Sequence, residues 1–261
     1  MNEFYIIPNT KHLTASNLIL PLKDYSVGFD VYYTTSEINE LSRNYNVSVI
    51  INKFLHKIDI DNILNTINKL KNIEYFFIED LGLMTLLPKD KVVVSQNHII
   101  NNYDSINYFK ELGYSNILIN NDLTINEIKE IKDNTSSKLF MYYISKNNLM
   151  YSKRHLISSF NMYKNDNLKY KNTISEKVSN HKLIIKEENC GTCIFNERIF
   201  SASKYVGDLN GIMKIVNLSN LSNEEVNIIL NNLENKELNK LLDIDDYFLD
   251  NEIAYKVGDL K

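Results

Sequence analysis

The sequence predicts an α/β fold, a (β/α)8 TIM-like barrel with an insertion of short strands between strands 7 and 8. Across residues 1–144, short β-branched or aromatic runs alternate with longer helical stretches, a pattern typical of βα units and a parallel sheet. An eighth such run, 211–218, is followed by a capped helix, and eight strands favour a closed barrel over an open sheet. We therefore expect one barrel domain over residues 1–261, with 145–210 as an insertion.

The expected elements follow from composition and spacing. The strands are predicted at 3–8, 27–33, 47–52, 74–79, 91–96, 115–120, 138–144 and 211–218. The helices are predicted at 35–44, 59–71, 103–113, 124–133 and 222–235. Thr124 and Glu127 have the spacing of a capping box, and Gly113 stands where a helix C′ glycine belongs. Within the insertion, residues 160–172, 181–189 and 193–201 look like short strands of hairpins.

Composition and charge exclude several classes of protein. Of the 261 residues, 44% are hydrophobic, which indicates a globular chain with a buried core and not a disordered one. The formal net charge of −4 supplies no global field for gathering nucleic acid, so any RNA contact would need a local basic patch. We expect no membrane contact, since no apolar run reaches the length of a span and the amino terminus lacks the pattern of a signal peptide. A cytoplasmic protein is the expectation.

Polar residues follow the predicted strands where a barrel places its functional groups. The candidates are Asn52, Lys53, Asp80, Gln96 and Asp122. Amides and a few charges orient a polar ligand well but are poor nucleophiles and bases, so this set favours binding. The alternative stays open, because Asn and Asp are also ordinary loop and N-cap residues and this chain is rich in Asn.

Well-known catalytic motifs are missing from the sequence. It contains no HExxH metal pair, no GxSxG nucleophile elbow, no GxGxxG fingerprint and no P-loop. Zinc-protease, α/β-hydrolase, dinucleotide and nucleoside-triphosphate chemistry therefore lack support.

Two short clusters could still carry chemistry. Cys190 and Cys193 form a CxxC, but a closed zinc or iron–sulfur site needs four ligands and the chain has two thiols. We predict no cofactor or iron–sulfur cluster, with the two cysteines as weak metal candidates only. Lys153, Arg154 and His155 follow the seventh strand, where they could hold a carboxylate or phosphate or form a solvated loop cluster.

Five collinear blocks resemble peptidase family U32, the collagenase-like peptidases. They are 52–63 (NKFLHKIDIDNI), 73–87 (IEYFFIEDLGLMTLL), 95–128 (beginning SQNHIINNYD), 152–157 (SKRHLI) and 191–201 (GTCIFNERIFS). The chain looks closest to the shorter member of the paired U32 proteins of low-GC Gram-positive bacteria. The resemblance implies a barrel and a peptidase. The family pattern adds Asn101 and Arg154 to Asn52, Asp80 and Gln96 around a small polar ligand.

The departures from the family pattern shape the functional hypotheses. Asn121 and Asp122 replace the family's Arg-Glu, His155 stands where cluster-bearing members have a cysteine, and Cys193 replaces a histidine. The resemblance thus implies a U32 protein that acts as a subunit with a longer U32 paralogue, on a peptide or RNA substrate. Two alternatives remain: a non-peptidase component of an RNA or small-molecule hydroxylation system, and a degenerate ligand-binding scaffold.

Overall fold

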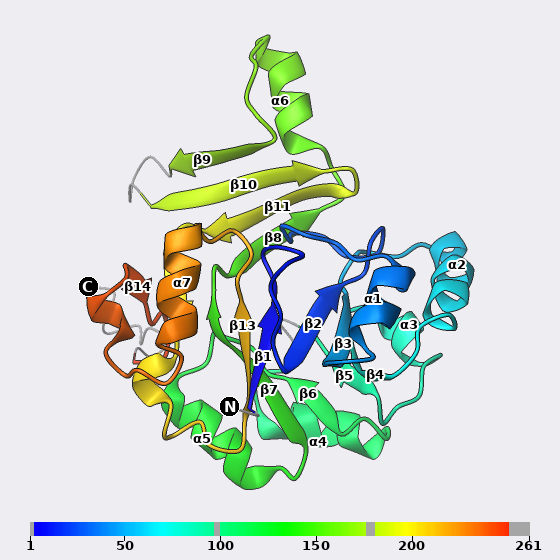
Figure 1. The fold of residues 1–261 in the computed structure, drawn as a ribbon, viewed down its shortest axis with the longest axis vertical. Helices are drawn as coiled ribbons and strands as arrows, with labels where there is room; N and C mark the ends of the chain where they lie inside the picture. The colour runs from blue at the N-terminus through cyan, green and yellow to red at the C-terminus, as the bar shows by residue number, and fades with distance from the viewer. Residues whose placement is uncertain (1–2, 97–99, 176–180, 251–261) are drawn as a thin grey trace, which may run out of the picture.

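The barrel predicted from the sequence is confirmed (Figure 1). A computed structural model describes residues 3–96, 100–175 and 181–250, and within them eight parallel strands close into a ring. In order around the ring the strands are β1 (Phe4–Ile7), β2 (Asn17–Pro21), β3 (Asn46–Ile51), β4 (Ile73–Ile78), β5 (Val92–Val94), β6 (Asn116–Leu118), β7 (Lys138–Ser145) and β13 (Met213–Asn217). β13 pairs with β7 on one side and with β1 on the other, which closes the barrel.

The second strand lies earlier in the chain than predicted. β2 is Asn17–Pro21, whose five residues are all buried, and the expected strand 27–33 is a loop. The apolar side chains of this loop are buried for another reason. Phe29 joins the cluster inside the barrel, and Gly28 (φ +91°) packs so closely on Phe195 that an added Cβ would lie 3.0 Å from its ring. The loop 27–33 is apolar because it covers the mouth of the barrel, and its composition therefore resembles that of a buried strand.

The predicted helices are confirmed on the outside of the barrel. They are α1 (Thr35–Leu41), α2 (Lys57–Ile67), α4 (Tyr103–Glu111), α5 (Ile125–Asn134) and α7 (Asn223–Asn231). The capping box forms as expected, since Glu127 N donates to Thr124 Oγ1 at 3.2 Å and Thr124 N donates to the Glu127 carboxylate at 2.7 Å. A further single turn, α3 (Leu81–Met84), follows β4 directly.

Alternate strand residues fill the inside of the barrel. The inner cluster is Tyr5, Ile7, Ile19, Phe29, Ile50, Phe77, Val93, Leu118, Phe140 and Ile215. Phe140 meets Tyr5 and Phe77 edge to face at centroid distances of 5.6 and 5.4 Å. The lumen is therefore a packed core, as in other barrels of this type, and any ligand must bind above it at the carboxyl ends of the strands.

Most of the insertion forms a separate antiparallel sheet that lies above the barrel in Figure 1. Its strand order is β8 (Asn148–Ser152), β11 (Gly191–Asn196), β10 (Lys182–Glu188) and β9 (Lys171–Ser175). The strand expected within 160–172 is wrong in part, because its first residues belong to α6 (Leu156–Lys164) at the far end of the insertion. Many apolar side chains there are exposed, so their spacing does not report a buried strand face.

The last strand of the insertion joins the barrel sheet instead. β12 (Ile199–Ser201) pairs antiparallel with the end of β7, beyond the point where β6 stops, and carries β14 (Ile244–Asp245) on its other side. The chain thus returns to the barrel wall before β13 begins.

A charged cluster ties the small sheet to the loop that follows β2. Lys186 Nζ on β10 lies 2.8 Å from Glu188 Oε1 and 3.7 Å from Asp30 Oδ1. The Tyr32 hydroxyl donates to Glu188 Oε2 at 2.5 Å. Burial, and then the Glu188 charge, raise the pKa of the Tyr32 phenol. These contacts hold the insertion as a partial roof over the barrel mouth.

No helix in the described part of the chain is long and apolar enough to span a bilayer.

Candidate functional site

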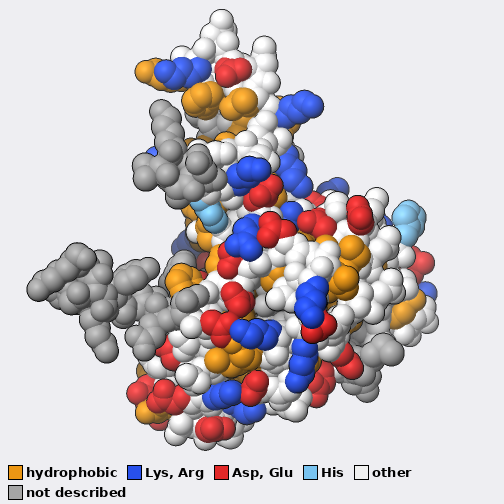
Figure 2. Space-filling model, turned by 90° about the vertical axis from the view of Figure 1, so that its left-hand side faces the viewer, with side chains coloured by type: hydrophobic (Ala, Val, Ile, Leu, Met, Phe, Trp, Pro, Cys, Tyr) orange, Lys and Arg blue, Asp and Glu red, His pale blue; other side chains and the backbone are white. Residues whose placement is uncertain are grey.

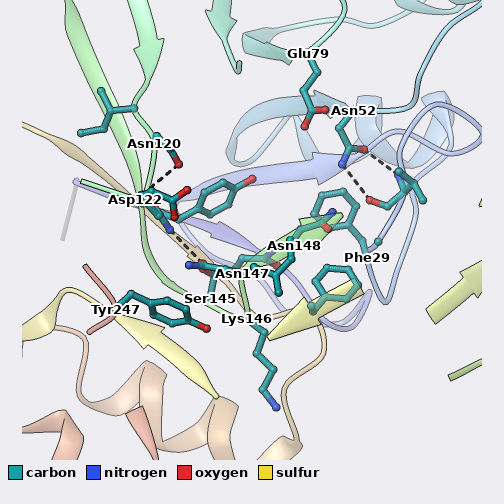
Figure 3. Close-up of a pocket in the computed structure, with 18 of the residues that line it drawn as sticks. Phe29, Asn52, Glu79, Asn120, Asp122, Ser145, Lys146, Asn147, Asn148 and Tyr247 are labelled. Atoms are coloured by element: carbon teal, nitrogen blue, oxygen red, sulfur yellow. Dashed lines mark hydrogen bonds between the residues drawn. The ribbon is translucent and has the colours of Figure 1, made fainter. Parts of the chain in front are cut away.

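Two adjoining cavities of about 380 and 630 Å³ lie at the carboxyl ends of the barrel strands. Both are lined by Asn52 and Glu79 from the barrel and by Asn148 and Leu149 from β8. The barrel supplies the floor and the insertion supplies the roof; Figure 3 shows the smaller cavity. This is the position where barrels of this class bind their ligands.

The polar floor of the cavities follows a simple rule of register. Side chains alternate across a strand, so a residue two positions beyond an inward-facing core residue also faces inward. The residues in that position are Asn52, Glu79, Ser95, Asn120, Tyr142 and Asn217. All six line a cavity. Of these six, Asn52 alone is among the candidates chosen by sequence, although the alternation after the inward-facing residues could have found the others.

Glu79 is the unusual group of the site. Its carboxyl is directed from the end of β4 toward the cavity (Figure 3), and it forms no hydrogen bond or ion pair with any described residue. Although part of its surface faces the cavity, protein surrounds the carboxyl on nearly every side. Burial therefore raises the pKa of Glu79 to about 8. At neutral pH the site holds a protonated carboxyl group.

Tyr142 adds a second polar group to the same floor. Burial raises the pKa of its phenol, and the nearby Glu79 charge raises it further. The phenol therefore stays protonated. Because the charge of Glu79 affects the pKa of Tyr142, a ligand bound to Glu79 also changes the electrostatic potential at the Tyr142 hydroxyl.

Amide side chains form one wall of the smaller cavity. Asn147 Oδ1 accepts from Ser145 Oγ at 2.6 Å and from Asn121 Nδ2 at 3.2 Å. Asn121 Oδ1 is buried and has no hydrogen-bond partner. A buried carbonyl oxygen without a donor is costly, and this wall holds one at Asn121.

The serines at the mouth are not arranged as nucleophiles. Ser145 donates to an amide oxygen, which cannot act as a general base. Among the described residues, neither Ser145 nor Ser95 has a hydrogen bond to an imidazole or a carboxylate. The cavity therefore lacks the hydroxyl–base pair of covalent hydrolysis in the part of the chain that the structure describes.

A serine, histidine and glutamate do meet elsewhere, at the start of α6, but in a structural role. Glu187 accepts from Ile157 N at 2.7 Å and from Ser158 N at 3.1 Å, and it also accepts from the Ser158 hydroxyl. His155 Nδ1 lies 3.8 Å from Glu187, so the imidazole does not stand between the hydroxyl and the carboxylate. Although burial opposes it, this donor set lowers the pKa of Glu187. Glu187 caps α6 from a neighbouring strand.

Asn52 and Lys53 lie at the mouth of the barrel, and each has a protein partner. Asn52 holds the backbone of Val27, since its Oδ1 accepts from Val27 N at 2.9 Å and its Nδ2 donates to Val27 O at 3.1 Å. The dashed lines beside Asn52 in Figure 3 mark these bonds. Lys53 Nζ lies 4.0 Å from Asp59. Asn52 therefore shapes the cavity through the covering loop.

Asp80 and Gln96 border the larger cavity. The Asp80 carboxylate accepts from Leu83 N at 2.8 Å, so it is the N-cap of α3. Gln96 Nε2 donates to the backbone oxygen of Glu79 and helps fix the end of β4. Gln96 therefore fixes the backbone at Glu79, and Asp80 fixes the turn that follows it.

The remaining candidates are more scattered. Asp122 is exposed but lines the smaller cavity. Asn101 Oδ1 accepts from Asn120 at 3.1 Å and lies outside both cavities, as does the exposed Arg154 on the insertion. The structure thus brings Asn52, Lys53, Asp80, Gln96 and Asp122 to the mouth and leaves the two residues taken from the family pattern outside it.

The CxxC cysteines lie in the β10–β11 hairpin as free thiols. Burial, with the Glu188 charge, raises the pKa of Cys190, and the same two causes raise that of Cys193 to about 12. Thiols with raised pKa values are poor nucleophiles. The described residues contain no group of three or more His, Cys, Asp or Glu that could hold a metal ion.

Fold and site together define a (β/α)8 barrel protein with a polar ligand cavity at the carboxyl ends of its strands. The sequence model of peptidase family U32 matches residues 36–218, which is most of the chain, so the chain belongs to this family. A solved structure titled "The Structure of the U32 Peptidase Mk0906" is similar at 15% sequence identity and a TM-score of 0.43. That match covers 55% of this chain and 69% of the other. A comparison with curated proteins finds no match.

Proposed function

We propose that this chain is the ligand-binding subunit of a two-chain U32 enzyme. In this proposal its barrel mouth holds part of a peptide substrate, and a longer U32 paralogue, its partner in the cytoplasm, carries the chemistry. One observation carries the proposal: the cavity presents the unpartnered carboxyl of Glu79 among amide side chains, but no hydroxyl–base pair among the described residues. Groups of this kind bind and orient a ligand without cleaving it. The chain 1–261 acts here as one barrel unit, and its free thiols suit a reducing compartment.

The insertion supports the partner in this proposal. Phe160, Met162 and Tyr163 on or near the outer turn of α6 are 43%, 85% and 82% exposed, and Tyr170 nearby is 71% exposed. Apolar side chains gather on this projecting arm in Figure 2. Aromatic residues and methionine are enriched in protein interfaces, and contiguous exposed apolar groups are uncommon on monomers.

RNA is the second candidate ligand, and the charge of the same arm favours it. Residues 153–171 contain five Lys and Arg against one Asp, in a chain whose net charge is −4. Tyr163 and Tyr170 lie exposed among these cations. Exposed aromatic rings between cations are typical of surfaces that bind single-stranded nucleic acid.

The test is co-expression with a longer U32 paralogue from the same genome. We expect the two chains to co-purify, and the pair to cleave a peptide mixture that this chain alone leaves intact. Tyr163→Asp on the arm should weaken the complex at least tenfold, whereas Tyr108→Asp, at a residue 59% exposed on α4, should not. An isolated chain that cleaves peptides, and loses the activity in Asp80→Asn or Arg154→Ala, would contradict the proposal. Tight binding of a labelled RNA oligonucleotide without partner binding would favour the second candidate.

A further inference from the structure

The smaller cavity holds a carboxyl group without a partner, and a ligand can supply that partner. The Glu79 carboxyl meets no hydrogen-bond donor among the described residues, and the buried Asn121 Oδ1 has none either. We propose that this cavity binds a protonated primary amine, whose N–H groups satisfy Glu79 and neighbouring oxygen atoms. The inference rests on the proposed function and names the chemical class of the group that the subunit holds.

Once Glu79 ionises, the groups that line the cavity favour a cation. Its lining includes two carboxyl groups, Glu79 and Asp122, and one amine, Lys146. Lys146 Nζ is directed to Glu225 at 3.7 Å, and only 9% of the lysine side chain is exposed. Its charge is thus already partly balanced from outside the barrel. An ammonium group brought beside Glu79 would meet a carboxyl that forms no ion pair with a described residue and that ionises when a cation arrives.

The shape of the cavity suits an ammonium group on an apolar stem. Oxygen atoms of the strand ends line the floor and one wall, whereas Phe29, Leu149 and Phe195 line the side toward the insertion. An ammonium group has three donors and no acceptor, which matches a site rich in oxygen acceptors. A volume of about 380 Å³ admits a short chain and excludes a large folded group.

Amine binding in this site must be coupled to release of a proton. Because burial raises the pKa of Glu79 to about 8, the carboxyl is mostly protonated at pH 7 before the ligand arrives. An adjacent ammonium stabilises the ionised form, so the proton leaves to the buffer. With full ionisation in the complex, about 0.9 of a proton is released per ligand at pH 7.

Calorimetric titration with n-butylammonium chloride at pH 7 tests the proposal. Alkylammonium groups titrate near ~10.4, so the probe itself is already charged. Repeating the titration in two buffers of different ionisation enthalpy measures the protons released. We expect saturable binding with release of about 0.9 proton. Glu79→Gln should release no proton and should bind the amine at least tenfold more weakly. Glu111→Gln, the same substitution at an exposed position on α4, should keep both the affinity and the proton release of the unchanged protein.

Two further probes separate the possible sources of the amine. Tri-alanine amide, compared with its N-acetylated form, reports on a peptide amino terminus, and butylammonium reports on a small free amine. Either source supports the proposal if Glu79→Gln removes the effect. Equal binding of neutral butyramide, binding without proton release, or no binding of any amine would overturn it. Partner binding in the co-expression experiment is a separate readout, so either proposal can fail while the other stands.

Discussion

Replacing Glu79 with glutamine should change how the free energy of unfolding depends on pH. Burial raises the pKa of Glu79 in the folded protein to about 8, from an ordinary value of 4.5. The folded protein therefore holds this proton more tightly than the unfolded chain does. The stability that the proton contributes is fully present below the unfolded pKa and is lost as the pH rises through the folded pKa.

The size of the effect follows from the two pKa values. A difference of one bound proton changes stability by about 1.4 kcal/mol per pH unit. Integrated between pH 5 and pH 7 with values of 4.5 and about 8, the loss in the unchanged protein is about 2.5 kcal/mol. The amide of the Glu79→Gln variant cannot ionise, so the variant avoids that loss. Its stability relative to the unchanged protein should rise by the same amount across this interval.

Urea unfolding followed by circular dichroism at several pH values measures the difference. The chain has 17 Tyr and no Trp, so circular dichroism gives a stronger signal than fluorescence. Glu111→Gln serves as the control, because it makes the same substitution at an exposed site. If the stabilities of Glu79→Gln and the unchanged protein run parallel from pH 5 to pH 7, the Glu79 carboxyl is not held neutral and the reasoning is refuted.

Three further variants test the supports of the site. Asn52→Ala removes both bonds to the Val27 backbone and should cost about 1–3 kcal/mol of stability in urea unfolding; a loss below a few tenths would show that the loop needs no such anchor. Glu187→Ala removes the cap of α6, so hydrogen exchange of the α6 amides should rise about tenfold or more while the barrel is unchanged; uniform protection would contradict the capping role. In the unchanged protein, Glu187 should contribute to the stability of α6 above its unfolded pKa. That contribution should vanish as the pH falls through the lowered folded pKa, and the same hydrogen exchange measured at acid pH should show it. Lys186→Met removes the ion pairs with Asp30 and Glu188, so hydrogen exchange of the β10 and β11 amides should become faster. Unchanged exchange in these two strands would contradict the role of Lys186.

The fold could be predicted because its signal is repeated along the chain. Each parallel strand is buried on both faces and reads as a short apolar run, and each helix outside the barrel needs an apolar stripe and a cap such as that of Thr124. The exceptions are segments that cover the mouth. The loop around Phe29 is apolar because it packs under the insertion, and exposed α6 has no buried stripe of the usual kind.

The position of the site could be predicted from the sequence, but the residues that line it could be predicted less well. Polar strand ends indicated the mouth, and Asn52 and Asp122 do line the cavity. The sequence candidates include Asp80 and not Glu79, although the alternation through Tyr75 and Phe77 turns Glu79 inward and leaves Asp80 to cap α3. The roof from β8 could not be derived, because it depends on contacts between segments far apart in the sequence, such as those of Lys186.

The charge state of the Glu79 carboxyl is the central claim, and carbon NMR can observe it directly. Protein labelled with ¹³C at the glutamate side-chain carboxyl should show one resonance, assigned by its loss in Glu79→Gln, that titrates near pH 8. Saturating n-butylammonium should move that midpoint to a clearly lower pH. A Glu79 resonance that titrates near its ordinary value of 4.5, and does not respond to the amine, would contradict the account.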